Sequence, residues 1–135
     1  MNECAKQNIP FLFAFDFDLN EALFIEDPSD QTEILFQTTL GGNSRPAAAL
    51  TKKIGNIEFH SEPFDDYKRR FNIVKHALQR GDSFLVNLTS RTPVSTNLSI
   101  KEIFDSTDAP YRLYVPERFV CFSPERFVFI QEDGT

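Results

Sequence analysis

The sequence predicts an α+β domain built mainly from antiparallel sheets flanked by helices. Apolar residues alternate with a period of two near the N-terminus and again in the last third of the chain, which is typical of strands. One long segment between them has the periodicity of an amphipathic helix. The strands are grouped with helices between the groups, and this order favours antiparallel sheets. We expect the order β, β, α, loop, α, β, α, β, β, β.

Phenylalanine occupies every second position from 11 to 17, which predicts a strand with its aromatic face inward. Asp16 and Asp18 alternate with these rings and are expected to point outward. A turn at 20–21 and a short partner strand at 22–25 would complete a hairpin.

Residues 27–36 are expected to form a short helix, because Asp-Pro-Ser-Asp is a common helix beginning. Glycine and proline residues indicate an exposed, flexible loop at about 40–50. The clearest helix covers 65–80, where apolar residues recur at i, i+4, i+7 and i+11. Gly81 follows it and predicts a left-handed C-terminal cap.

A strand is predicted directly after this helix, at 84–91, because neighbouring side chains would face opposite ways in alternation. Asn87 and Arg91 share its polar face. Ser99 and Glu102 then match a capping box, in which each side chain binds the backbone N–H of the other. A short helix with one apolar side should follow.

The last third of the chain contains three strand-like runs, at 111–115, 119–122 and 126–131. An Asp-Gly pair at 133–134 follows the third run, and this pair is a strong hairpin signal because it tolerates positive φ. One residue remains after that turn, so we interpret residues 1–135 as an incomplete N-terminal part of one domain. The third run would then be an open edge, and we expect self-association by strand pairing near 127–130.

The composition argues against several classes of function. A formal net charge of −6 disfavours nucleic acid as a partner, and we interpret the basic cluster at 68–70 as a solvated helix face. Cys4 and Cys121 are too few and too far apart for a zinc site or a disulfide framework. The sequence has neither a signal peptide nor an 18-residue apolar stretch, so we expect a cytoplasmic protein without membrane association.

No catalytic or metal-binding residues are predicted. The sequence lacks a glycine-rich phosphate loop, a nucleophile elbow and a His-Glu-x-x-His pattern. We interpret both histidines, His60 and His76, as structural or surface residues. The Ser-Pro-Glu segment at 123–125 places a carboxylate between two apolar runs, and we favour a tight turn there over a catalytic role.

Three segments resemble the family of chorismate-utilising enzymes. The run Gly-Asp-Ser-Phe-Leu-Val-Asn-Leu-Thr-Ser-Arg at 81–91 is similar to the family's Gly-Asp-x-aromatic-x-Val-Asn-Leu-x-x-Arg run. Ala-Pro-Tyr at 109–111 and Phe-Ser-Pro-Glu-Arg-Phe at 122–127 are similar to its Pro-Tyr segment and its Ser-Pro-Glu-Arg-Phe turn. The resemblance covers most of 9–131, and these motifs are most similar to the branch of aminodeoxychorismate synthase component I (para-aminobenzoate synthase).

The resemblance implies a large domain of two packed antiparallel sheets flanked by helices, of which this chain would be the N-terminal portion. It implies a parent enzyme, a transferase, that replaces the 4-hydroxyl of chorismate with ammonia, giving 4-amino-4-deoxychorismate for folate biosynthesis. A glutamine amidotransferase subunit (component II) would supply the ammonia, and Mg²⁺ would clamp the chorismate carboxylate. The lysine thought to attack the ring belongs to a Pro-x-Lys-Gly-Thr motif, expected to begin a few residues after Thr135. Residues 1–135 alone are therefore expected to bind no Mg²⁺ and to be inactive.

The chain departs from the family pattern in two places. Leu85 stands where the family often has glutamine, and the Leu-Leu-Glu-Ser element of tryptophan-inhibited anthranilate synthases is absent, which puts feedback by tryptophan in doubt. Asn87 and Arg91 are the candidates for supporting the substrate site of the complete enzyme, although cross-strand hydrogen bonding explains them at least as well. Two alternatives stay open: component I of anthranilate synthase, and a non-enzymatic binding module with half of this fold.

Overall fold

The structure, a computed structural model, describes residues 1–44, 56–124, 126, 128 and 129. The chain divides into two compact units, one of Met1–Lys52 with Leu98–Thr135 and one of Lys53–Asn97. Every strand pair between described residues is antiparallel, and helices accompany the strands in both units. The predicted α+β class with mainly antiparallel sheet is therefore confirmed.

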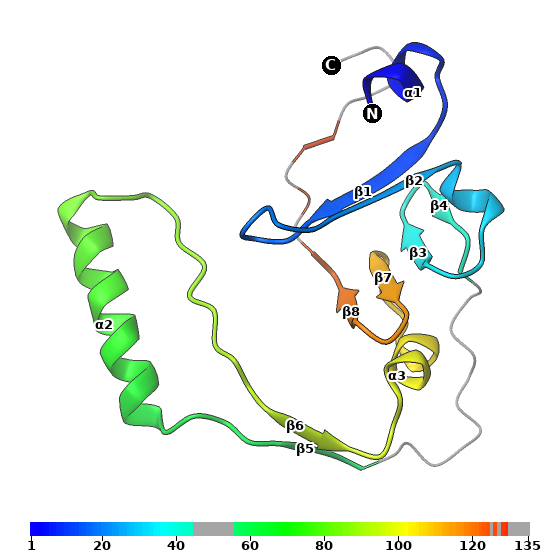
Figure 1. Ribbon diagram of the computed structural model, residues 1–135. Coiled ribbons are helices and arrows are strands. Elements are labelled where there is room, and N and C mark those ends of the chain that lie inside the picture. The colour runs from blue at the N-terminus through cyan, green and yellow to red at the C-terminus, as the bar shows by residue number, and fades with distance from the viewer. Residues whose placement is uncertain (45–55, 125, 127, 130–135) are drawn as a thin grey trace. The chain divides into compact units, whose positions relative to one another are not determined.

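The first unit contains a two-stranded sheet, β1-β2, and a four-stranded sheet of order β4-β3-β7-β8 (Figure 1). Pairing of β3 with β7 places Leu35 opposite Tyr114, so this sheet joins segments more than seventy residues apart in the sequence. The elements of the unit are α1 (Asn2–Lys6), β1 (Phe11–Phe15), β2 (Ala22–Glu26), a 3-10 turn η1 (Pro28–Asp30), β3 (Leu35–Thr38), β4 (Gly41–Gly42), α3 (Ile100–Ser106), β7 (Arg112–Val115) and β8 (Phe119–Phe122).

The predicted N-terminal hairpin forms, and Asp16 and Asp18 are exposed as expected, but most of the aromatic face is exposed as well. Phe13 and Phe15 are 46% and 54% exposed, with ring centroids 5.6 Å apart, while Leu12 and Ala14 on the other face are half-buried. The prediction of an inward aromatic face was therefore wrong for Phe13, Phe15 and Phe17, while Phe11 is half-buried. Its cause is that the residues between the phenylalanines are themselves apolar, and a period of two cannot tell which of two apolar faces is covered.

The helix predicted at 27–36 was also wrong, since only η1 forms and β3 follows it. Asp27 has a left-handed φ of 45° and makes no side-chain cap. The Gln31 side chain instead forms hydrogen bonds with nearby backbone groups. Its amide oxygen accepts from the N–H groups of Glu33 and Ile34, at 2.9 and 2.8 Å. These local bonds compete with helix formation, and pairing with β7 then selects the strand.

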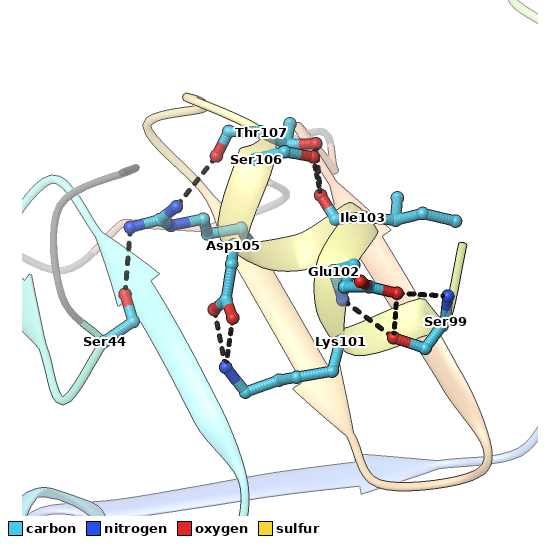
Figure 2. Close-up of polar contacts among 9 residues, drawn as sticks. Ser44, Ser99, Lys101, Glu102, Ile103, Asp105, Ser106 and Thr107 are labelled. Carbon is cyan, nitrogen blue, oxygen red and sulfur yellow. Dashed lines mark hydrogen bonds and ion pairs between the residues drawn. The ribbon is translucent and has the colours of Figure 1, made fainter. Parts of the chain in front are cut away.

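The capping box predicted before α3 is confirmed. The Ser99 hydroxyl accepts from the Glu102 N–H at 3.2 Å, and the Ser99 N–H donates to the Glu102 carboxylate at 2.9 Å (Figure 2). The helix so fixed turns Phe104 towards β7 and β8, where its ring lies 5.6 Å from Tyr114 and 6.5 Å from Phe122. Phe104 is 1% exposed and forms the centre of the core of this unit.

The second unit consists of β5 (Ile57–Phe59), α2 (Phe64–Arg80) and β6 (Val94–Thr96), with β5 and β6 paired. The long predicted helix is confirmed to within one residue of its expected start. Gly81 has a φ of 84° and ends the helix in the left-handed conformation, as predicted.

The strand predicted at 84–91 does not form: the segment between α2 and β6 runs in extended form without a helix or strand (Figure 1). A strand needs a neighbour to exchange backbone hydrogen bonds, and the described residues provide none here. The carbonyl of Thr89 instead accepts from the side chain of Arg70. The strand prediction made from the alternating pattern was therefore wrong.

Two of the three final strands are confirmed as β7 and β8. Of the third predicted strand, at 126–131, the structure describes only Arg126, Val128 and Phe129, and these three residues lie in no strand. The Asp-Gly turn at 133–134 also lies outside the described residues, so the open edge near 127–130 stays a prediction. Gly41 and Gly42 of the expected loop form β4, and 45–50 lies outside the described part.

Candidate functional site

Asn87 and Arg91, the two residues predicted to support a site, both lie in the extended segment between α2 and β6. Both are exposed, and neither makes a hydrogen bond or ion pair with a described residue. Because no strand forms at 84–91, the two residues do not share the polar strand face that the sequence predicted. Their position depends instead on what holds Thr89 and Ser90, two of the three residues between them.

Arg70 holds this segment to helix α2. One nitrogen of its guanidinium donates to the backbone carbonyl of Thr89 at 2.9 Å, and the other donates to the Ser90 hydroxyl at 2.9 Å. Both contacts fall between Asn87 and Arg91 in the sequence. The arginine therefore fixes the stretch of backbone that carries both candidate residues.

Glu62 completes the network from the residues just before α2. Its carboxylate forms an ion pair with Arg70 and accepts from the Ser90 hydroxyl at 2.8 Å. Ser90 accepts from Arg70 and donates to Glu62, so the three side chains form a closed set of bonds. We call Glu62, Arg70 and Ser90 the helix–segment network. Its charge-assisted bonds connect a residue just before α2, the helix and the segment after it, so its role is to hold backbone in place.

The prediction of a solvated basic face at 68–70 was correct for two of its three residues. Lys68 is exposed, and Arg69 forms an exposed ion pair with Asp66 at 3.1 Å. Arg70 is different, because it points towards the extended segment. A single sequence gave no signal for this contact, since Arg70 and Ser90 are twenty residues apart.

A second polar cluster, in the first unit, surrounds Arg112. This residue is 5% exposed, lies over the ring of Phe104 at 5.0 Å, and donates to the Thr107 carbonyl at 2.8 Å and to the Ser44 hydroxyl at 3.2 Å. Its two acceptor residues, Ser44 and Thr107, are labelled in Figure 2. The sequence offered one signal for it, an arginine inside the otherwise apolar run at 111–115, and that signal was missed.

Arg112 also borders a cavity of about 390 Å³. The lining residues are Gln37, Thr38, Thr39, Ser44, Asp108, Ala109, Pro110 and Arg112. The arginine is already committed to two oxygen acceptors and to an aromatic ring, so we assign it a structural role. It ties the C-terminal end of α3 to the segment after β4.

Two of the remaining polar candidates, His60 and Ser123, have structural contacts. His60 lies with its Nε2 2.7 Å from the Ser95 hydroxyl, beside the β5–β6 pair, and its backbone N–H donates to the Pro93 carbonyl. His76 is an exposed residue of α2. Ser123 has a φ of 48° and its N–H donates to Tyr111, which agrees with a turn, while Glu125 lies outside the described residues.

Within the described ranges, no group of three or more histidine, cysteine, aspartate or glutamate side chains is placed to hold a metal ion. Nor does any helix in the part of the chain that the structure describes have the length and apolar character needed to cross a membrane.

Comparison with known proteins places this geometry in context. The family described as chorismate binding enzyme matches residues 15–135. Two curated relatives match nearly the whole chain. An uncharacterized PabA-like protein of Haemophilus influenzae is 36% identical over 133 residues, which are 98% of this chain and 40% of the relative. An uncharacterized PabA-like protein of Pasteurella multocida is 34% identical over 134 residues, which are 98% of this chain and 41% of the relative.

The chain therefore spans about two fifths of the length of the curated relatives it matches. No solved structure matches it. All three sequence motifs quoted above fall within the residues that the family matches.

Proposed function

Because the chain belongs to the family of chorismate binding enzymes, we propose that it forms the N-terminal portion of an aminodeoxychorismate synthase component I. The observation that carries the proposal is the family match over 15–135, within which the Val-Asn-Leu and Ser-Pro-Glu-Arg-Phe motifs favour this branch. The two relatives, both named PabA-like, support the para-aminobenzoate theme.

In this proposal the complete enzyme works in the cytoplasm and exchanges the 4-hydroxyl of chorismate for ammonia. The product, 4-amino-4-deoxychorismate, feeds folate biosynthesis. The ammonia comes from a glutamine amidotransferase subunit, and Mg²⁺ is the metal. No carboxylate cluster among the described residues fits the ion, so the described part of this chain supplies no ligand set for it.

The contribution of this chain to that reaction is scaffold. Two groups of its described polar side chains hold segments of the chain together: Arg70 with Glu62 and Ser90, and Arg112 with Thr107 and Ser44. The Ser90 hydroxyl donates to the Glu62 carboxylate at 2.8 Å, but Arg70 binds both groups, so we assign this pair a structural role and not that of a nucleophile and its base. The chemistry is therefore assigned to residues other than these.

The product made by the protein translated from the complete reading frame tests the proposal. With chorismate, ammonium and Mg²⁺ we expect 4-amino-4-deoxychorismate, identified by mass and by chromatography against a standard. Anthranilate as the sole product would contradict the proposed branch and favour the anthranilate alternative. Absence of any amino product, with the protein folded, would contradict the proposed activity.

Residues 1–135 alone are expected to form no 4-amino-4-deoxychorismate under the same conditions, because the described polar groups lack an attacking lysine and a metal site. The measurement is product formation over hours, against a reaction without protein. Product above that background, lost when the chain is removed by precipitation, would contradict the assignment of the chain as scaffold.

The binding-module alternative makes a different prediction, a monodisperse protein that melts cooperatively and exposes little apolar surface. Several large apolar side chains are fully or largely exposed here, among them Phe17, Leu19, Leu40 and Phe84. Such surfaces favour a portion of a larger fold over a finished module. A sharp thermal transition without dye binding would favour the module.

A further inference from the structure

We propose that Arg70 is a positioning residue, which together with Glu62 holds the backbone between Asn87 and Arg91 and so sets where both side chains are presented. The functional meaning of this role rests on the proposed function. The positioning itself does not, because it concerns contacts within one unit of the chain.

The first argument is the place at which Arg70 binds. The segment between α2 and β6 has no helix or strand to fix it. Its carbonyl at Thr89 and hydroxyl at Ser90 both accept from the one guanidinium, at 2.9 Å each. A planar guanidinium with two parallel donors fixes both distance and orientation of what it binds. One side chain therefore substitutes for the missing strand partner.

The second argument is that Arg70 is itself held. Glu62 pairs with it and also accepts from Ser90, so the guanidinium cannot rotate away without breaking contacts on both sides. The side chains of Arg70 and Glu62 are 37% and 27% exposed, so water competes with these bonds less than at a fully exposed pair. Glu62 therefore fixes the Arg70 side chain in the orientation in which it binds the segment.

The third argument is the contrast with its neighbour. Arg69 is next in the sequence and lies on the same helix, yet its side chain is 73% exposed and its partner, Asp66, belongs to the helix itself. Arg69 can stabilise α2 but has no contact that would hold the extended segment. Comparing variants of the two arginines therefore distinguishes an effect on the stability of α2 from an effect on the position of the segment.

The test compares Arg70→Met with the matched control Arg69→Met by backbone ¹⁵N relaxation in the 135-residue chain. In the unmodified chain we expect order parameters at 87–91 close to the rigid value of about 0.85. In Arg70→Met we expect values below about 0.6 at these residues, with α2 unchanged. Arg69→Met should leave 87–91 as in the unmodified chain.

Three further variants test the individual contacts of Arg70. Ser90→Ala removes one of the two anchor points and should loosen the segment in part, as should Glu62→Gln, which removes the charge but keeps the shape. Arg70→Lys keeps the charge but offers no planar pair of donors, so we expect only partial rescue.

Order at 87–91 that persists in Arg70→Met would overturn the proposal. Equal loosening of α2 and 87–91 in both arginine variants would also overturn it, because Arg70 would then act through helix stability. If Arg70→Met does not fold, unchanged order in Ser90→Ala and Glu62→Gln together would overturn it. None of these readings requires turnover, so failure here is separable from failure of the proposed activity.

Discussion

Replacing Phe104 with alanine is expected to lower the free energy of unfolding of the first unit by about 3 to 5 kcal/mol. Phe104 is 1% exposed, and its ring contacts Tyr114, Phe122 and the guanidinium of Arg112. Removal of the ring leaves a cavity that the strands of a short four-stranded sheet cannot close without breaking their pairing. Urea denaturation followed by circular dichroism measures the loss.

Phe17→Ala is the matched control, because the same atoms are removed from a fully exposed side chain. Its effect should remain within about 0.5 kcal/mol. If Phe104→Ala prevents folding, Phe104→Leu removes less volume and should give an intermediate loss. Equal effects at positions 104 and 17 would contradict the placement of the core.

Replacing Arg112 with methionine is expected to destabilise the same unit by about 2 kcal/mol, because two half-buried oxygen acceptors lose their charged donor. The Thr107 carbonyl and the Ser44 hydroxyl are those acceptors, at 2.8 and 3.2 Å. Methionine fills much of the volume of arginine, so the loss reports mainly on the polar contacts. Thermal and urea denaturation both measure it.

Arg118→Met provides the comparison for a surface arginine. Arg118 pairs with Glu21, and both side chains are 61% exposed, so that pair should contribute less than about 1 kcal/mol. A similar loss in the two variants, or stabilisation by Arg112→Met, would contradict the structural role assigned to Arg112.

Local signals in the sequence were sufficient for the elements that local bonds determine. The apolar stripe of α2, the left-handed Gly81 and the reciprocal bonds of Ser99 and Glu102 all involve residues a few positions apart. The information needed to predict them was therefore contained within one helix or one cap.

Long-range partners decided the elements that the sequence did not predict. β3 forms because β7, more than seventy residues later, pairs with it, and residues 84–91 remain unpaired because no described strand lies beside them. The alternation of apolar and polar residues reports an extended backbone but not its neighbour. The aromatic face of the hairpin was predicted wrongly for the same reason, because the alternation does not show which face another element covers.

The candidate site shows the same division. Sequence motifs marked the run at 81–91 and with it Asn87 and Arg91. They could not mark Arg70 and Glu62, which meet that run only through the fold. Arg112 could have been found, since a charge within an apolar strand must have polar partners when it is buried.

The coding sequence directly after the Thr135 codon tests the central claim most directly. If this chain is the scaffold portion of an aminodeoxychorismate synthase component I, the reading frame continues and encodes a Pro-x-Lys-Gly-Thr motif within a few codons. A stop codon immediately after Thr135, or a continuing frame without that lysine, would contradict the claim.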